Sequence, residues 1–112
     1  MHEMSITQSL LEVALAEAAK SGAKRITAIN IKIGALTGVV EESVAMYLGF
    51  LAKDTPAEGA RLVATAMPVT AHCAACDIIF PVEDLVFVCP RCGGMAQVVT
   101  GRELFIESLE IE

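Results

Sequence analysis

Several residue types are scarce in this sequence. It has no tryptophan, one tyrosine and two histidines, and its eight basic residues stand against fourteen acidic ones, for a net charge of −6. The basic residues are scattered, apart from the pair Lys24-Arg25. A nucleic-acid-binding protein usually concentrates positive charge on one surface. We therefore expect no nucleic-acid partner.

Long apolar runs are also missing. Charged residues such as Glu12, Glu83 and Asp84 interrupt the apolar stretches, and none reaches the roughly 18 residues that a membrane-spanning helix needs. Glu3 stands where a secretory signal would carry basic residues. We expect no membrane span and a cytoplasmic location, where cysteines remain thiols rather than disulfides.

The sequence also lacks the residue sets that enzymes use. It contains no Ser/His/Asp combination, no glycine-rich phosphate-binding loop and no acid–base pair within a motif. We therefore expect a non-enzymatic protein.

Aliphatic residues are abundant by contrast. The sequence is 54% hydrophobic with few aromatics, so a core of Ile, Leu, Val and Ala is feasible and disorder is excluded. Apolar residues recur at three- and four-residue steps over two segments, which predicts two amphipathic helices, at residues 4–20 and 41–53. They alternate over three others, which predicts strands at residues 25–34, 61–70 and 102–111.

The order of these elements indicates an α+β fold. Two helices would pack on a small three-stranded sheet, with a zinc-ribbon module inserted before the last strand. Pro68 suggests that the second strand is an edge strand or ends there. We predict two parts: residues 1–70 plus 101–112 as an α/β domain, and residues 71–100 as the inserted module.

All four cysteines lie in that insert. The pattern is Cys73-Ala-Ala-Cys76, twelve residues, then Cys89-Pro-Arg-Cys92-Gly93-Gly94. Two such pairs can supply four thiolates in the tetrahedron that Zn(II) accepts, and the spacing is close to that of a zinc ribbon. We expect a structural zinc ion and a hairpin in the spacer. Two disulfides, a redox pair and an iron–sulfur centre are the less favoured alternatives.

The amino terminus offers a second, weaker metal-binding pattern. A terminal amine, backbone nitrogens and the His2 imidazole can close small chelate rings, which suit Ni(II) or Cu(II), and Glu3 adds a carboxylate nearby. Most terminal histidines are simply solvated, so this pattern alone decides little. His72 beside Cys73 is expected to be an ordinary surface histidine.

Taken together, these motifs resemble the hydrogenase nickel-incorporation protein family (HypA/HybF). The resemblance covers the whole chain and rests on Met1-His2-Glu3, Ile33-Gly34, Ala57-Glu58-Gly59-Ala60, the two cysteine pairs, Gly101-Arg102-Glu103-Leu104 and Ser108-Leu109-Glu110-Ile111.

The resemblance implies a nickel metallochaperone for nickel–iron hydrogenase maturation. Nickel, a transient cargo, would bind at His2 with Glu3 close by, and Glu41 or Glu42 is a further candidate. The zinc module would be structural and help partner recognition. Its expected partners are a GTPase accessory protein and the hydrogenase large-subunit precursor. Some relatives carry histidines beside the zinc cysteines, where this chain has Met95.

Some alternatives stay open at this point. The chain is expected to be a monomer or a weak homodimer, and a role in urease maturation is not excluded. The main competing interpretation is a zinc-ribbon adaptor that binds protein or nucleic acid without a nickel role. Replacing His2 and titrating nickel would separate the two.

Overall fold

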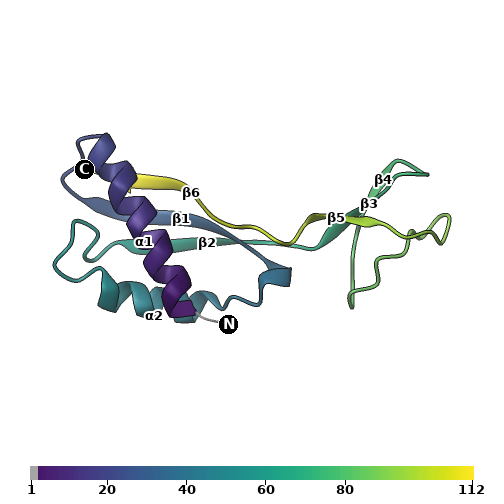
Figure 1. Cartoon of the computed structure of the whole chain (residues 1–112), viewed down its shortest axis with the longest axis horizontal. Helices are drawn as coiled ribbons and strands as arrows, with labels where there is room; N and C mark the ends of the chain where they lie inside the picture. Colours follow the sequence, from purple (N-terminus) through teal and green to yellow (C-terminus); the bar gives the residue numbers. More distant parts are fainter. Residues whose placement is uncertain (1–2) are drawn as a thin grey trace.

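The computed structural model describes residues 3–112, so the candidate ligand His2 lies outside the described part. The chain is elongated, with extents of 55 × 26 × 16 Å (Figure 1). Its elements are, in order, α1 (Glu3–Lys20), β1 (Ile26–Gly34), the 3₁₀ turn η1 (Ala35–Thr37), α2 (Glu41–Leu51), β2 (Arg61–Met67), β3 (Thr70–Cys73), β4 (Ile78–Pro81), β5 (Gln97–Thr100) and β6 (Leu104–Ile111).

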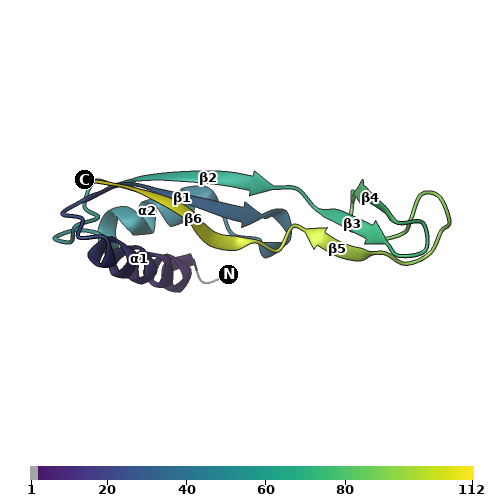
Figure 2. The same ribbon diagram turned by 90° about the horizontal axis from the view of Figure 1, so that it is seen from above.

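Two separate three-stranded sheets occupy the two ends of the molecule. The larger has the order β2-β1-β6, with β2 parallel and β6 antiparallel to the central β1. Both helices cover the same face of this sheet (Figure 2). The smaller sheet has the order β4-β3-β5 and is antiparallel. The predicted α+β architecture, two helices on a three-stranded sheet with an inserted cysteine module, is confirmed.

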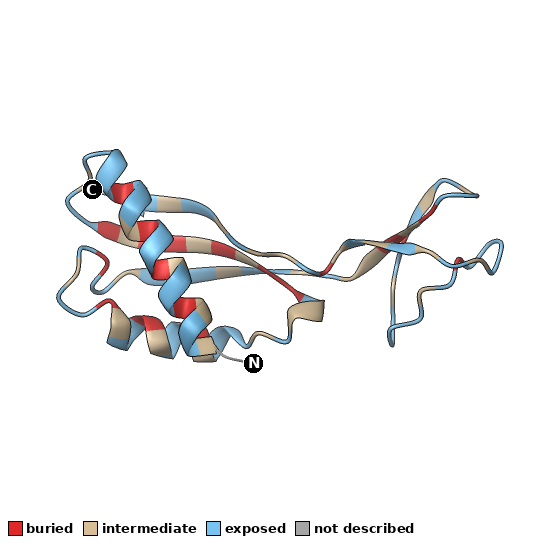
Figure 3. Cartoon of the chain, in the orientation of Figure 1, coloured by how far each residue is buried: buried red, intermediate tan, exposed pale blue. Residues whose placement is uncertain are grey.

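The main core lies between the larger sheet and the two helices. Ile29, Ile31 and Ile33 alternate along β1 on the predicted inward face, and all three are buried. Figure 3 shows buried segments in red along α1, α2 and β1. The buried residues that the two helices contribute to the core cluster are Leu11, Ala14, Ala18, Val44 and Leu48. Burying each large aliphatic side chain stabilises the fold by about 1.5–3 kcal/mol.

The ends of the elements follow local chemistry. The first helix ends at Lys20, as predicted, and Gly22 follows with a positive φ of 68° that suits glycine. Strand β2 is an edge strand and ends at Met67, directly before Pro68, as that proline indicated.

The backbone segments around Gly34 and Gly101 lie very close to each other where the two sheets join. The Gly34 amide donates to the Glu103 carbonyl at 2.6 Å, and the Leu36 amide donates to the Gly101 carbonyl at 2.7 Å. A side chain at Gly34 would overlap the backbone of Gly101 and Arg102. The close crossing therefore requires glycine at this position.

One local prediction differs from the structure. The spacer between the cysteine pairs does not form its own hairpin, because β4 pairs back with β3. Leu85 to Val88 were expected to form the second strand of that hairpin. Instead they begin in a turn, because Asp84 and Leu85 both have positive φ, of 52° and 59°. Left-handed residues cannot continue a strand, and only an isolated bridge between Val88 and Met95 remains.

Candidate metal centre

The four cysteine side chains converge at the end of the molecule that carries the smaller sheet. Cys73 ends β3 and Cys76 follows in the turn, while Cys89 and Cys92 come from the loop before β5. All four sulfur atoms lie within 4.8 Å of one another. The predicted grouping of Cys73, Cys76, Cys89 and Cys92 is therefore what the fold produces.

Each cysteine pair is shaped by a tight turn. The Asp77 amide donates to the Cys73 carbonyl at 2.7 Å, and the Gly93 amide donates to the Cys89 carbonyl at 2.9 Å. Asp77 and Gly93 both have positive φ, so the chain reverses directly after each pair. Each turn therefore places its two sulfur atoms close together, and the two pairs face the same point.

Backbone amides also point at the sulfurs. The Arg91 amide donates to Cys89 Sγ and the Gly94 amide to Cys92 Sγ, both at 3.4 Å. Such donors stabilise thiolate charge, which a metal site with four cysteines must accommodate.

The spacing of the sulfurs fits a tetrahedral metal ion. With metal–sulfur bonds of about 2.3 Å, the edges of such a tetrahedron measure about 3.8 Å. Cys73 Sγ and Cys92 Sγ are 3.6 Å apart, much farther than in a disulfide, and all four cysteines are free thiols. Four thiolates complete a closed shell and leave no position for a reacting water.

The thiols differ in acidity while no metal holds them. Hydrogen bonds from the Cys92 and Arg91 amides lower the pKa of Cys89 to about 7. The neighbouring Cys92 thiol and burial raise the pKa of Cys76 to about 12. A metal that takes all four sulfurs must displace the proton from Cys76, so its binding releases protons.

His72 lies outside the sulfur cluster, as expected of an ordinary histidine. Its Nε2 is 2.9 Å from Asp77 Oδ1, which ties the last residues of β3 to the turn after Cys76. Met95, next to the second pair, is 80% exposed.

Glu3 lies in the first turn of α1, and its side chain reaches the start of α2. The Val40 amide donates to Glu3 Oε2 at 3.4 Å, and Val40 is the N-cap of α2, without a side-chain cap of its own. Glu41 and Glu42 follow in the first turn of α2. Glu41 also lines a hollow of about 170 Å³ with residues of β1 and β2. The carboxylate of Glu3 thus reaches the start of the helix that carries Glu41 and Glu42.

The contact between Glu3 and Val40 is one that sequence reasoning missed. Its signal is weak, because the hydrogen bond uses the backbone of Val40 and joins residues 37 positions apart. The missing side-chain cap on α2 was the available hint, since an uncapped helix start needs an acceptor from elsewhere.

Comparison with known proteins decides the family. A model of the family described as "Hydrogenase/urease nickel incorporation, metallochaperone, hypA" matches residues 1–111. The chain belongs to the HypA family. This family consists of non-enzymatic nickel metallochaperones that act in hydrogenase maturation, so the predicted metallochaperone role and the absence of enzymatic activity follow from membership.

Curated relatives match over 95% or more of their length. A hydrogenase maturation factor HypA of Dehalococcoides mccartyi is 43% identical over 113 residues, covering 100% of this chain and 95% of the relative. One of Caldanaerobacter subterraneus is 40% identical with full coverage of both chains, and one of Geobacter sulfurreducens is 42% identical with full coverage of both.

Two solved structures share the fold. The solution structure of the Ni metallochaperone HypA from Helicobacter pylori aligns with a TM-score of 0.71 at 23% identity, covering 99% of this chain and 97% of that one. A second HypA solution structure aligns with a TM-score of 0.78, also at 23% identity, covering 100% of this chain and 97% of that one. Within residues 3–112, we find no helix that is both long enough and apolar enough to cross a membrane.

Proposed function

We propose that this chain binds Ni(II) at its amino terminus and delivers it to the nickel–iron hydrogenase large-subunit precursor in the cytoplasm. A GTPase accessory protein is the proposed partner in delivery. The observation that carries the proposal is the family match over residues 1–111, which includes His2 and Glu3.

The ligand chemistry supports His2 as the main side-chain ligand. A neutral imidazole together with backbone nitrogens suits Ni(II), and an exposed chain end allows the metal to be exchanged. Glu3 would act beside it. Its carboxylate accepts from the Val40 amide, so Glu3 fixes the first turn of α1 against the start of α2. One of Glu41 and Glu42 can complete the site from that helix.

The cysteine module would carry a structural Zn(II) ion. Cys73, Cys76, Cys89 and Cys92 would hold it, and the bound ion would supply cross-linking of the loops rather than reactivity. Soft sulfur ligands for zinc and harder nitrogen ligands for nickel would keep the two metals on their own sites. We also propose that residues 71–100 form a separate unit that contributes to partner recognition.

Calorimetric titration of nickel into the zinc-loaded protein tests the site. His2→Ala should remove most of the nickel affinity and leave the zinc content and fold intact. Binding should weaken between about pH 7.5 and about pH 6, because protons compete for an imidazole that ordinarily titrates near about 6.5. Unchanged affinity in His2→Ala would refute the assignment.

Matched variants extend the titration to the carboxylates. Glu3→Gln, Glu41→Gln and Glu42→Gln each remove one negative charge at nearly constant size. The variant whose affinity falls identifies the acidic ligand, and Glu12→Gln on the same helix as Glu3 serves as the control. An extension before Met1 tests whether a terminal amine takes part.

A zinc-ribbon adaptor without a nickel role is the competing function. It predicts full partner binding and no nickel-selective site in either the wild type or His2→Ala. A pull-down of the hydrogenase precursor and the GTPase with His2→Ala should still recover both partners, because the cargo site and the docking surfaces are proposed to be separate.

A further inference from the structure

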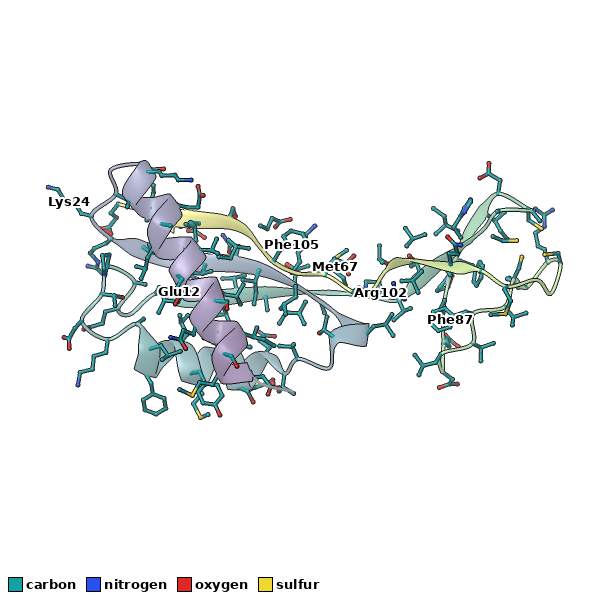
Figure 4. All side chains as sticks on the ribbon, in the orientation of Figure 1. Glu12, Lys24, Met67, Phe87, Arg102 and Phe105 are labelled. Atoms are coloured by element: carbon teal, nitrogen blue, oxygen red, sulfur yellow. The ribbon has the colours of Figure 1, made fainter. Side chains whose placement is uncertain are left out.

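A continuous groove runs between helix α1 and strand β6. Its two halves, of about 490 Å³ and 340 Å³, meet at Val13 and Ile106, which line both. One wall is the full length of α1 and the other is β6, the strand on which Figure 4 labels Phe105.

The helical wall has a regular pattern. The residues at its rim recur every four positions, so they form one ridge of the helix, and three of the five are serine: Ser5, Ser9, Val13, Glu17 and Ser21. Short side chains along the ridge leave the groove open. Leu10 and Ala14 lie at its floor, so the half nearer the amino terminus is largely apolar.

The other wall is an edge of the sheet. Strand β6 pairs with β1 on one side, and among residues 3–112 no strand pairs with its outer side. An edge strand presents unpaired amide and carbonyl groups, which an added strand can satisfy about 4.8 Å away. The opposite edge, β2, borders a smaller hollow of about 170 Å³ near Glu41.

The charged lining residues of the groove are both acidic. Glu17 is 3.4 Å from Lys20, and Glu107 is 3.0 Å from Lys32. Both ion pairs lie at the surface, where such pairs hold weakly and an incoming cation can replace the lysine. A bound segment should therefore carry lysine or arginine.

The same charges disfavour a second copy of this chain. Pairing of two β6 edges would align Glu107 and Glu110 of both copies along one line, between two molecules of net charge −6.

We propose that the α1–β6 groove binds an extended, basic segment of another protein by adding a strand to β6. Apolar side chains on one face of that segment enter the groove beneath α1, and a basic side chain on the same face reaches Glu17 on the α1 wall. Basic side chains on the opposite face of the segment reach Glu107, which pairs with Lys32. This docking site is independent of nickel binding and stands whether or not His2 holds the metal.

The experiment uses a blocked eight-residue peptide of alternating valine and lysine, with lysine also at one end of its valine face, which matches the 8 residues of β6. The protein is the zinc-loaded full chain, observed through its amide NMR spectrum. Addition of the peptide should shift amides of residues 104–111 and of the α1 ridge, and slow the hydrogen exchange of β6. Shifts confined to other surfaces, or no shifts at millimolar peptide, would overturn the proposal.

Two modified peptides separate strand addition from simple charge attraction. Methylating the amides along one edge of the peptide keeps every side chain but removes the hydrogen bonds to β6, so binding should be lost. A peptide with glutamate in place of lysine should also fail to bind. Retained binding of the methylated peptide would refute strand addition.

Variants of the chain provide the matched control. Glu17→Lys combined with Glu107→Lys should weaken peptide binding about tenfold, whereas Glu12→Lys, a single charge reversal of the same kind on the same helix but off the groove, should change it less than about twofold. Ser9→Trp, which fills the groove from an exposed position, should abolish binding with the spectrum of the core unchanged. A free chain that sediments as a dimer with protected β6 amides would instead assign the groove to a second copy.

Discussion

The two ends of this molecule are held together by different forces. The helix-covered sheet surrounds a cluster of 11 buried residues, all aliphatic, whereas the cysteine end buries only 4, of which 2 are cysteines. A unit of about 30 residues with so small a core cannot remain folded through apolar burial alone. This difference supports the proposal that the cysteine end depends on a bound ion to fold, while apolar burial holds the helix-covered end.

The surface of the cysteine end also reflects its small core. At the cysteine end, large apolar side chains remain in solvent, with Ile79 exposed by 63%, Leu85 by 66% and Met95 by 80%. These side chains have no second layer to pack against, because the small sheet carries no helix.

Loss of one sulfur should unfold the cysteine end and spare the other. Cys89→Ser leaves an incomplete shell and forfeits much of a binding free energy of about 10–16 kcal/mol, which for such modules is folding free energy. We expect one zinc per chain in the wild type, none in the variant, and lost amide dispersion for residues 73–92 only. Ile79→Ser, at an exposed site on β4, should keep its zinc. A full zinc content in Cys89→Ser would contradict the metal-held account.

A cavity in the main core should destabilise the helix-covered end and leave the cysteine end unchanged. Ile31 is 1% exposed, so Ile31→Ala should lower the free energy of unfolding by about 2–5 kcal/mol and leave the zinc content unchanged. Urea denaturation followed by circular dichroism measures the loss. Val63→Ala, at a site that is 39% exposed on β2, should cost far less. Zinc loss in Ile31→Ala would show that the two ends unfold as one.

The junction between the two ends should tolerate no added side chain. Gly34→Ala would press a methyl group into the backbone of Gly101, and we expect a loss of about 1–3 kcal/mol in urea denaturation. Gly49→Ala is the control, because that glycine sits in α2 with open space around it, and alanine there should stabilise by about 0.5–1 kcal/mol. An equal effect of the two substitutions would show that the crossing is not tight.

The thiol titration tests whether the cysteine end keeps its geometry without an ion. In the folded geometry the metal-free thiols should titrate far apart, whereas unfolded thiols would titrate together near the ordinary value of 9.0. The pKa of Cys89 is lowered to about 7 and that of Cys76 is raised to about 12, so thiolate absorbance should begin to rise near neutral pH and reach completion only in strong alkali. By linkage, the lowered Cys89 pKa stabilises the metal-free fold at high pH, and this is lost as pH falls through about 7. The raised Cys76 pKa acts oppositely, with its stabilisation lost as pH rises above about 9. Cys76→Ser should remove the last step of the titration.

Most of the fold was predictable because it follows from local patterns. The alternation of Ile29, Ile31 and Ile33 reports a strand with one buried face, and Gly22 and Pro68 report where elements stop. The metal ligands were predictable for a similar reason. A Cys-x-x-Cys pair is a local turn, so its two sulfurs converge whatever the rest of the chain does.

The sequence by itself therefore determined the elements, their inward faces, the cysteine cluster and the family resemblance. Only the tertiary structure decided which elements meet: that β4 pairs with β3 instead of with Leu85 to Val88, that Glu3 reaches the Val40 amide, and that α1 leaves a groove along β6. Periodicity predicts which face of an element is buried, but it does not predict which element covers that face. The covering element depends on packing between segments that lie far apart in the chain.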